Sequence, residues 1–359
     1  MMGRAIVLMT AMPPTIGHAQ LIKFALAQRV STVHVIVTTR SFEPISGRLR
    51  AAALAEHFRR DKQVYIHEHL DDKAFQNPND APDADTFWNY WVSVAQCYMG
   101  NIRPNDVVVT SEAYGLEYAK RLNCRFLPYD LDRTIIDAKA TTVRKNIDWF
   151  SATELNVFKL MIPEMRRHCR TRVTFFGAES CGKTTMTFKL GSPYLMNAIC
   201  IPEYARSYVE SLGDNTLTED VMRSIMEGQN AYQTMDFDND ERMLIFQDTD
   251  LYSTIGYYGI NGMPLPPQIE PWAQVSESDL YIVMNDRIPF TPDHMRYGGD
   301  KREADTQYWL DVLAKYNVPQ NKIYQVQDTS HNDQINELFY FLTEYQSKKF
   351  ESWRTFERT

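Results

Sequence analysis

The chain has 359 residues, of which 44% are hydrophobic, and a formal net charge of −8 at pH 7. This length allows two domains of ordinary size, and the acidic balance argues against general nucleic-acid binding, which needs a basic surface. No apolar run approaches the roughly 20 residues that span a bilayer, and the N-terminus carries no cleavable signal pattern, so we expect a cytoplasmic protein with no membrane partner. The five cysteines form no C-x-x-C pair, which favours neither a disulfide framework nor a zinc site.

The first half of the chain alternates strand-like and helix-like segments. Apolar, β-branched runs predict strands at residues 5–9, 33–38, 64–67, 106–111 and 125–127, with helices near 18–29, 48–60, 86–98 and 113–122. The polar stretch 71–85 is typical of a loop. Alternation of this kind predicts an α/β domain with a parallel sheet and helices on both faces.

A second alternating series begins near residue 171. We expect strands at 172–176, 198–201, 243–247, 279–284 and 322–326, with helices that include 217–232 and 302–316. Residues 152–169 look like a connecting helix interrupted by Pro163. The sequence therefore predicts two domains, at residues 1–150 and 171–359, joined by a linker at 151–170.

The segment from Gly177 to Thr184 fits the phosphate-binding pattern G-x-x-x-x-G-K-[ST] without a mismatch. A predicted strand precedes it and a helix at 184–190 can follow, which is the arrangement that lets backbone N–H groups and a helix N-terminus face a phosphate. Lys183 would then reach the β- and γ-phosphates, and the Thr184 hydroxyl would reach Mg²⁺. The residues expected to hold this ATP are Gly177, Glu179, Ser180, Cys181, Gly182, Lys183, Thr184 and Thr185.

A second candidate phosphate site follows the first predicted strand. Residues 10–18 form a turn with two prolines that ends in Gly17 and His18 at the start of a helix. Gly17 allows a close backbone approach, and His18 can donate to phosphate oxygens. On its own, the same pattern also suits a helix-capping turn with an incidental histidine.

Residues 15–18 match the [HT]-x-G-H signature of the nucleotidyltransferase superfamily, and residues 140–144 look like its second signature. Residues 48–50 resemble the basic element of that superfamily, 88–92 a tryptophan segment, and 132–134 a short element before the second signature. With the downstream phosphate loop, this order resembles the bifunctional nicotinamide-nucleotide adenylyltransferase/ribosylnicotinamide kinase family (NadR-type) over roughly residues 5–345. We expect the chain to lack the helix-turn-helix that precedes many bacterial members. It departs from the family pattern at Lys139, where a serine is usual, and at Gly47, where an acidic residue is usual.

The resemblance implies that the first domain transfers an adenylyl group from ATP to nicotinamide mononucleotide. The nucleophile is already an anion, so catalysis rests on positioning and charge stabilisation. The residues implied for ATP binding are Thr15, Gly17, His18, Arg48, Arg133, Lys139, Thr141 and Arg144, with His18 and Arg144 also acting in catalysis. Trp91 is implied to stack on nicotinamide, although its i, i+3 spacing from Trp88 also suits packing of a helix face.

The second domain is implied to phosphorylate ribosylnicotinamide at its 5′-hydroxyl. Asp248 ends an apolar strand beside the phosphate loop, which is the usual position for a Mg²⁺ ligand. Glu203, Tyr204, Arg206 and Asp250 are expected to hold the riboside, with Glu203 or Asp250 as the group that receives the hydroxyl proton. The polar segment 286–302 suits a lid over the phosphates, with Arg296 as its best candidate. Tyr252, Tyr257 and Tyr258 fit either the nicotinamide pocket or the core.

The sequence thus predicts a two-headed enzyme that uses ATP and Mg²⁺ to convert ribosylnicotinamide to nicotinamide mononucleotide and then to NAD. Its partners are these small molecules, and self-association is compatible with the sequence. Two alternatives remain open. One is a nucleotide or NAD sensor with a decayed site, suggested by Lys139 and Gly47. The other keeps both folds but uses another nucleoside and another phosphorylated acceptor.

Overall fold

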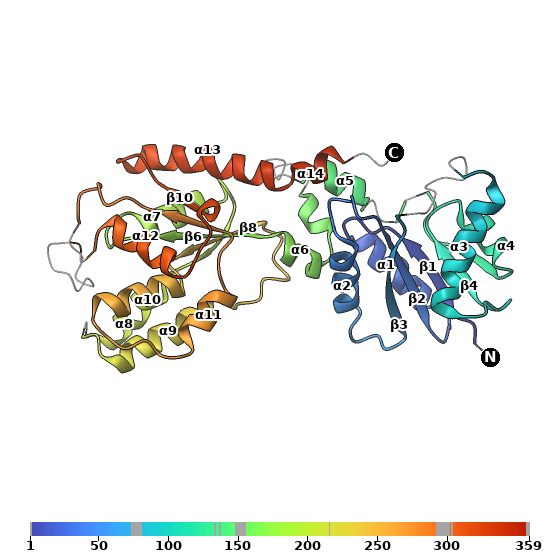
Figure 1. Ribbon diagram of the computed structural model, residues 1–359, viewed down its shortest axis with the longest axis horizontal. Helices are drawn as coiled ribbons and strands as arrows, with labels where there is room; N and C mark the ends of the chain where they lie inside the picture. Colours follow the sequence, from blue (N-terminus) through green and yellow to red (C-terminus); the bar gives the residue numbers. More distant parts are fainter. Residues whose placement is uncertain are drawn as a thin grey trace. The chain divides into compact units, whose positions relative to one another are not determined.

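The computed structural model describes residues 2–72, 81–132, 134–135, 138–147, 156–214, 216–291, 302 and 304–356. The chain divides into two compact units (Figure 1), and each is described by itself. Unit 1 is Met1–His168 with Ser347–Thr359, and unit 2 is Cys169–Gln346. Within the described residues, no helix combines the length and the apolar character needed to cross a bilayer.

Unit 1 contains a five-stranded parallel sheet in the order β3-β2-β1-β4-β5, which confirms the predicted α/β fold. The strands are β1 (Ala5–Met9), β2 (Val33–Thr39), β3 (Val64–Leu70), β4 (Val107–Thr110) and β5 (Arg125–Pro128). Strand β1 lies between β2 and β4, because Ala5 pairs with both Val33 and Val107. The order of the strands reverses beside β1, and ligands of open α/β sheets bind at the carboxyl ends of such strands.

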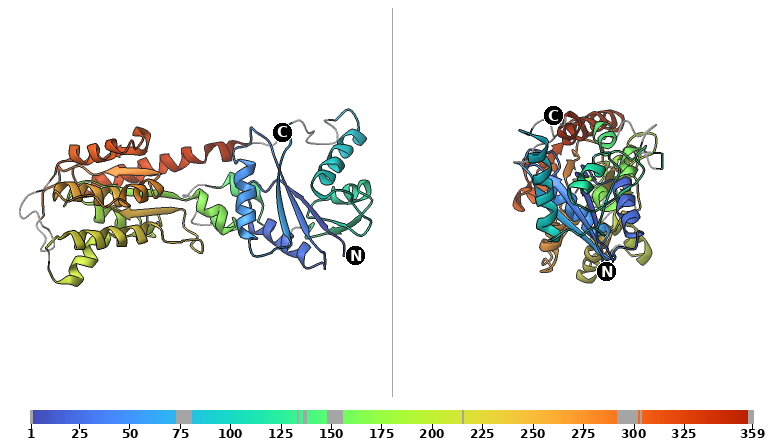
Figure 2. Two further views of the ribbon diagram at one scale, coloured as in Figure 1. Left: turned by 60° about the horizontal axis from the view of Figure 1, so that its bottom comes forward. Right: turned by 90° about the vertical axis from the view of Figure 1, so that its right-hand side faces the viewer.

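Helices connect these strands: α1 (Ile16–Leu26), α2 (Gly47–His57), α3 (Ala84–Met99) and α4 (Gly115–Arg121). Helix α5 (Ala140–Lys145) follows β5, the last strand of the sheet. Helices α3 and α4 cover one face of the sheet and α1 and α2 the other (Figures 1 and 2). Between the sheet and the helices α3 and α4 lies an apolar core, in which Ile6, Ile36 and Val108 of the strands meet aromatic side chains of α3 and α4.

The described part of the linker differs from the predicted interrupted helix over 152–169. A 3₁₀ helix, η3 (Val157–Leu160), is followed by an extended Met161, and α6 (Pro163–Cys169) then begins at the proline. Proline disfavours a helical conformation at the residue before it. It is well tolerated at the first position of a helix, because the N–H group that it lacks would have no partner within the helix there. Pro163 therefore starts a helix instead of breaking one.

Unit 2 contains a second five-stranded parallel sheet, in the order β10-β9-β6-β8-β7. The strands are β6 (Thr171–Phe176), β7 (Ile199–Ile201), β8 (Leu244–Asp248), β9 (Leu280–Val283) and β10 (Ile323–Gln325). Strand β6 is central, since Val173 pairs with both Phe246 and Leu280. The segments that follow β6, β8 and β9 therefore leave the sheet side by side.

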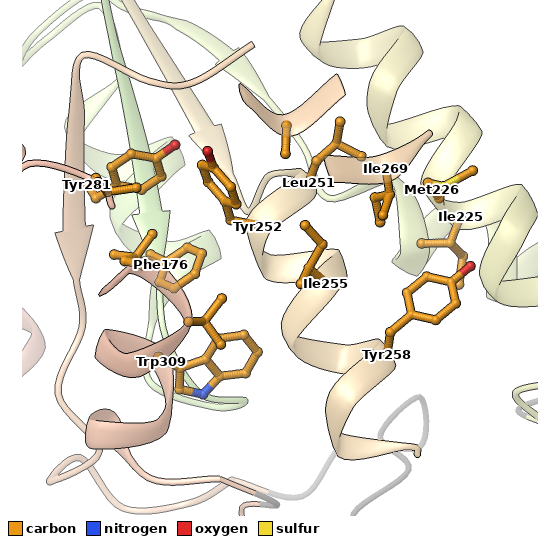
Figure 3. Close-up of a cluster of buried hydrophobic side chains, with 14 of the residues drawn as sticks. Phe176, Ile225, Met226, Leu251, Tyr252, Ile255, Tyr258, Ile269, Tyr281 and Trp309 are labelled. Atoms are coloured by element: carbon orange, nitrogen blue, oxygen red, sulfur yellow. The ribbon is translucent and has the colours of Figure 1, made fainter. Parts of the chain in front are cut away.

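Some helices of unit 2 pack on this sheet and others on neighbouring helices. The helices are α7 (Lys183–Leu190), α8 (Tyr204–Leu212), α9 (Glu219–Gln233), α10 (Leu251–Ile260), α11 (Ile269–Val275), α12 (Thr306–Lys315) and α13 (His331–Lys349), with the 3₁₀ helix η4 (Gln320–Lys322) before β10. Figure 3 shows the main core, in which Trp309 of α12 packs edge-on against Phe176, with ring centroids 5.5 Å apart, and Phe176 contacts Tyr281 at 5.8 Å.

The end of the chain is a second difference from the sequence analysis, which assigned all of 171–359 to the second domain. Helix α14 (Glu351–Thr355) packs against α5, so Ser347–Thr359 belongs to unit 1. The side chains of Phe350 and Trp353 are buried there, which removes apolar surface that a free tail would expose to water.

Trp309→Ala tests the core of unit 2. The indole is 1% exposed, so its loss is expected to leave a cavity and lower the free energy of unfolding of unit 2 by about 3–5 kcal/mol. Tyr340→Ala, at a side chain that is 74% exposed, is the control and should change this free energy by less than about 0.5 kcal/mol. Calorimetry that separates the two unfolding transitions is the measurement, and equal effects of the two variants would contradict the assignment of Trp309 to the core.

Candidate functional site

The phosphate-binding turn of unit 2 joins the central strand β6 to helix α7. Its backbone has positive φ at Gly177 (131°), Ser180 (57°) and Gly182 (92°), and Gly182 is the N-cap residue of α7. Glycine adopts the φ of 131° and 92° readily, whereas other residues would be strained there. This turn is the concave, N–H-rich backbone that the sequence motif predicts.

Lys183 lies along the turn. Its Nζ donates to the carbonyl oxygens of Gly177 (3.0 Å) and Ala178 (2.7 Å), and the residue is 8% exposed. A phosphate held by the turn would offer the same ammonium group anionic acceptors in place of two neutral carbonyls, which makes stronger hydrogen bonds.

Thr184 and Asp248 bring together two elements that are far apart in sequence. The Thr184 hydroxyl, at the start of α7, donates to Oδ2 of Asp248, at the end of β8. Asp248 is 1% exposed, and its Oδ1 has no hydrogen-bond partner among the described residues. Burial raises the pKa of Asp248, and the positive charge of Lys183 opposes this rise.

A buried carboxylate oxygen without a partner, beside a threonine hydroxyl, fits the hard oxygen ligands that Mg²⁺ prefers. Within the residues that the structure describes, no cluster of three or more His, Cys, Asp or Glu side chains forms a metal cage.

A cavity of about 450 Å³ opens beside the phosphate-binding turn. One wall is charged and includes Glu203 and Arg206, and the other is apolar and comes from α8, α9 and α10. The lining consists of residues 179–185 with Glu203, Ala205, Arg206, Val209, Leu217, Met222, Ile225, Thr254 and Tyr257. A turn for phosphate, two charged groups and an apolar wall suit a phosphorylated or phosphate-accepting nucleoside.

Glu203 has the most suitable carboxylate for proton transfer in this cavity. Burial, and then the charge of Asp248, raise the pKa of Glu203 to about 7, whereas Lys183 and Arg206 act in the opposite direction. A carboxylate that titrates near neutral pH is the kind that can exchange a proton with a substrate hydroxyl.

Tyr204 and Asp250, which we expected at the riboside, do not line the cavity. The Tyr204 ring stacks on Tyr208 at 5.7 Å, and Gly228 of α9 leaves space for it. The Asp250 carboxylate accepts the Ser253 N–H at 3.0 Å and so caps α10. Both side chains therefore have structural tasks that compete with substrate binding.

Of the three tyrosines considered, only Tyr257 lines the cavity, and Tyr252 and Tyr258 are core residues (Figure 3).

Two residues that sequence reasoning underrated contact the phosphate-binding turn. The Arg302 guanidinium donates to the carbonyls of Glu179 and Ser180 (both 3.0 Å), and also to those of Asp286 (2.8 Å) and Ile288 (2.5 Å) in the segment after β9. His331, at the start of α13, lies so close to Gly182 that a Cβ there would be 3.0 Å from its ring. The pattern around these residues carries no motif, so the sequence offered no signal beyond the positive charge of 287–302. Arg296, the preferred lid residue, lies outside the described residues.

In unit 1, Thr15 and His18 form a hydrogen-bonded pair at the carboxyl end of β1. The Thr15 backbone N–H donates to His18 Nδ1 at 3.0 Å, so Nδ1 is an acceptor and the neutral ring carries its proton on Nε2. The Thr15 hydroxyl donates to the carbonyl of Ala138 at 2.9 Å, and Thr15 is fully buried. The Thr15 hydroxyl thus ties the first signature segment to the second, and its backbone N–H orients His18. A direct contact of Thr15 with ATP stays a prediction.

Arg144 also joins the two signature segments. Its guanidinium donates to the Met12 carbonyl, in the turn after β1, and lies 3.4 Å from the Thr141 hydroxyl. Lys139, just before α5, and Arg48, at the start of α2, are exposed cations. Arg133 lies outside the described residues. The structure therefore brings Gly17, His18, Thr141 and Arg144 to one end of the sheet.

Arg50, not Arg48, is the buried cation of the basic element. It is fully buried, lies 2.5 Å from Glu43 and donates to the Thr39 hydroxyl at 2.6 Å. Gly47 packs so closely on Thr39 that a Cβ would lie 2.3 Å from the threonine Cβ. This explains the departure at Gly47, because no side chain fits there, and Glu43 supplies the carboxylate.

Trp91 is 8% exposed and belongs to the core layer under α3, where it contacts Tyr90 at 5.1 Å. Trp88 is 9% exposed and stacks on Tyr118 at 6.2 Å. The two indoles are equally buried, so packing explains both, and a stacking role that singles out Trp91 stays a prediction.

Known proteins resemble this chain both in sequence and in fold. Residues 172–332 match a family model described as an AAA domain. A solved structure of NadR protein in complex with NAD and AMP-PNP aligns over 100% of this chain and 98% of its own, with a TM-score of 0.61 and 21% identity. A second, of NadR protein in complex with NR, aligns over 96% of each chain, with a TM-score of 0.64 and 22% identity.

The chain has the NadR fold. The expected resemblance is therefore confirmed at the level of architecture, with both α/β sheets present and in the expected order. The part of the chain that matches the AAA domain model contains the phosphate-binding turn at residues 177–184.

Gly47→Ala tests the packing around Arg50. The added methyl group must displace Thr39, whose hydroxyl accepts from Arg50, so we expect unit 1 to lose about 1–3 kcal/mol of unfolding free energy. Ala55→Ser, at an exposed position of the same helix, should change it by less than about 0.5 kcal/mol. Chemical denaturation followed by a probe in unit 1 measures the difference. A neutral Gly47→Ala would show that the close contact with Thr39 is not a constraint.

Proposed function

We propose that the chain is a bifunctional enzyme of NAD synthesis, with a ribosylnicotinamide kinase in unit 2 and a nicotinamide-nucleotide adenylyltransferase in unit 1. The observation that carries this proposal is the cavity in which the phosphate-binding turn and the charged wall of Glu203 and Arg206 meet an apolar wall. Thr184 of this turn donates to Asp248, behind the lining of the cavity. Relatives of the same fold bind NAD, AMP-PNP and NR according to their descriptions, which agrees with this choice of substrates.

In the kinase reaction, the 5′-hydroxyl of ribosylnicotinamide attacks the γ-phosphorus of ATP. Glu203 orients this hydroxyl and accepts its proton, because its carboxylate lies in the cavity and titrates near neutral pH. Lys183 moves from the loop carbonyls to the phosphates and stabilises the charge that develops on the transferred group. Thr184 and Asp248 would hold Mg²⁺, which neutralises charge on the phosphate oxygens when bound. The apolar wall, with Tyr257, covers the flat nicotinamide ring.

In the transferase reaction, the phosphate of nicotinamide mononucleotide attacks the α-phosphorus of a second ATP, and pyrophosphate leaves. His18 donates from Nε2 to phosphate oxygens, since the Thr15 N–H occupies its Nδ1. Arg144 and Thr141 contribute from α5, and the exposed Arg48 and Lys139 are free to close on the triphosphate. Trp91 stacks on nicotinamide if its core position opens toward the ligand.

The sensor alternative loses one of its two supports. Gly47 is explained by its contact with Thr39, and Glu43 supplies a carboxylate to Arg50, so the change at residue 47 is not a sign of decay. The alternative with other substrates differs only in what the two sites accept, and the same experiment separates it.

A substrate panel assigns the two activities. The purified protein is incubated with ATP, Mg²⁺ and either ribosylnicotinamide or nicotinamide mononucleotide, and the products are separated by chromatography. Lys183→Ala should abolish phosphorylation of the riboside and leave NAD formation intact. His18→Ala should lower NAD formation by about 10²–10³-fold and leave the kinase intact. If the wild type produces neither the mononucleotide nor NAD, the proposal is wrong.

The pKa of Glu203 makes a prediction about pH. A raised pKa keeps Glu203 protonated below about pH 7, where it cannot accept a proton, so kcat/KM for the riboside should rise with pH up to about 7 and level off above it. Glu203→Gln should lose about 10²–10⁴ in kcat together with this pH dependence. Asp250→Asn is the matched comparison and should keep the pH profile, because Asp250 lies outside the cavity. A wild-type profile that is flat from pH 5.5 to 8 would remove Glu203 as the base.

A further inference from the structure

The segment after α13 returns the chain to unit 1. Phe350 and Trp353 are 2% and 8% exposed, and their rings meet edge-on with centroids 5.2 Å apart. The Arg354 guanidinium donates to the carbonyl (2.7 Å) and hydroxyl (2.9 Å) of Ser347, which holds the turn between α13 and α14. Residues 347–356 therefore form an ordered, apolar structure and not a loose tail. We call this the C-terminal clasp.

The C-terminal clasp packs against the helix that carries the second signature. Helix α5 has only six residues, and a helix this short is not stable on its own, so its position depends on the segments that pack against it. Two of these are η3 and α14. Its buried side is apolar, since Val143 and the following Ile147 are fully buried. The helix also carries Arg144, whose buried guanidinium donates to the Met12 carbonyl in the turn after β1 and to the Thr141 hydroxyl of the same helix.

The C-terminal clasp also reaches the segment before α2. The ring of Phe356 contacts that of Phe42 at a centroid distance of 6.4 Å. Phe42 lies between β2 and α2, and α2 begins with Gly47 and the exposed Arg48. The two segments that carry the proposed ATP-binding cations, α5 and the start of α2, are thus both in contact with, or adjacent to, residues from the end of the chain.

We propose that the C-terminal clasp is a positioning element of the adenylyltransferase site. It holds α5, and with it Arg144 and Thr141, against the turn that carries His18. The inference rests on the proposed function of unit 1. If the C-terminal clasp positions α5, the transferase site is complete only when the residues that follow the kinase unit in the sequence are present. A chain that ends within the kinase unit would therefore lack a complete transferase site. Phe350 and Trp353 touch no substrate and act through α5.

Trp353→Ala in the full-length protein is the main test, with Ser352→Ala, at an exposed neighbour, as the matched control. Misplacing a positioned group by about 1 Å can cost about 100-fold in rate, so we expect Trp353→Ala to lower the transferase kcat/KM by about 10–100-fold. The kinase activity of the same preparation should stay unchanged. Trp353→Phe should restore most of the transferase activity, because it refills the buried site. Phe356→Ala is a milder second variant in case Trp353→Ala does not fold, and it should lower the transferase activity in the same direction.

Hydrogen exchange of the backbone amides of residues 140–147 gives a readout that does not depend on any substrate. Exchange should be faster in Trp353→Ala than in the wild type or in Ser352→Ala, while the amides of β1 keep their protection. Unchanged transferase kinetics together with unchanged exchange in α5 would overturn the inference. So would a loss of kinase activity as large as the loss of transferase activity, since that indicates general instability. If the wild type makes no NAD, the proposed function fails instead, and the exchange experiment still decides whether the C-terminal clasp holds α5.

Discussion

Parallel pairing on both sides of a central strand is the constraint on which both candidate sites depend. In each unit the central strand, β1 or β6, has neighbours on both sides, so its backbone groups are used up within the sheet. Only beyond its carboxyl end do successive N–H groups become available to a ligand. The turn at Gly177–Gly182 and the turn that leads to Gly17 and His18 both lie at that point. In unit 2 the end of the neighbouring strand β8 brings Asp248 to the turn, and in unit 1 helix α5 brings Arg144.

Electrostatics then decides what the second site can do. Asp248 and Glu203 are two acidic groups close enough that the charge of one raises the pKa of the other. Lys183 and Arg206 oppose this rise, but burial and the neighbouring carboxylate prevail at Glu203. The carboxylate bound to the Thr184 hydroxyl suits a cation, and the one with a pKa near 7 suits a proton. The division of labour between two similar side chains thus follows from their surroundings and not from their chemical type.

In unit 1, several residues matter because they hold others in place. Thr15 orients the His18 ring through its N–H and ties the turn after β1 to Ala138 through its hydroxyl. Arg50 is fully buried between Glu43, Thr39 and backbone carbonyls, and Gly47 is small because Thr39 lies against it. The departure of this sequence from the family pattern at Gly47 therefore has a structural cause. Glu43 supplies the charge that residue 47 has no room to supply.

The sequence by itself determined the elements whose causes are local. Within the residues that the structure describes, these are the strands, the turn before Lys183 and the signature around His18, because strand patterns, glycines and caps act over a few residues. Sequence reasoning failed where the partner lies far along the chain. The sequence placed Asp248 beside the phosphate-binding turn, where the structure has it, but it also assigned Asp250 to the riboside, and only the fold shows that Asp250 caps α10. Tertiary structure likewise decided that the last residues belong to unit 1. The sequence shows that Phe350 and Trp353 are apolar and favour burial, but only the path of the folded chain determines which unit buries them.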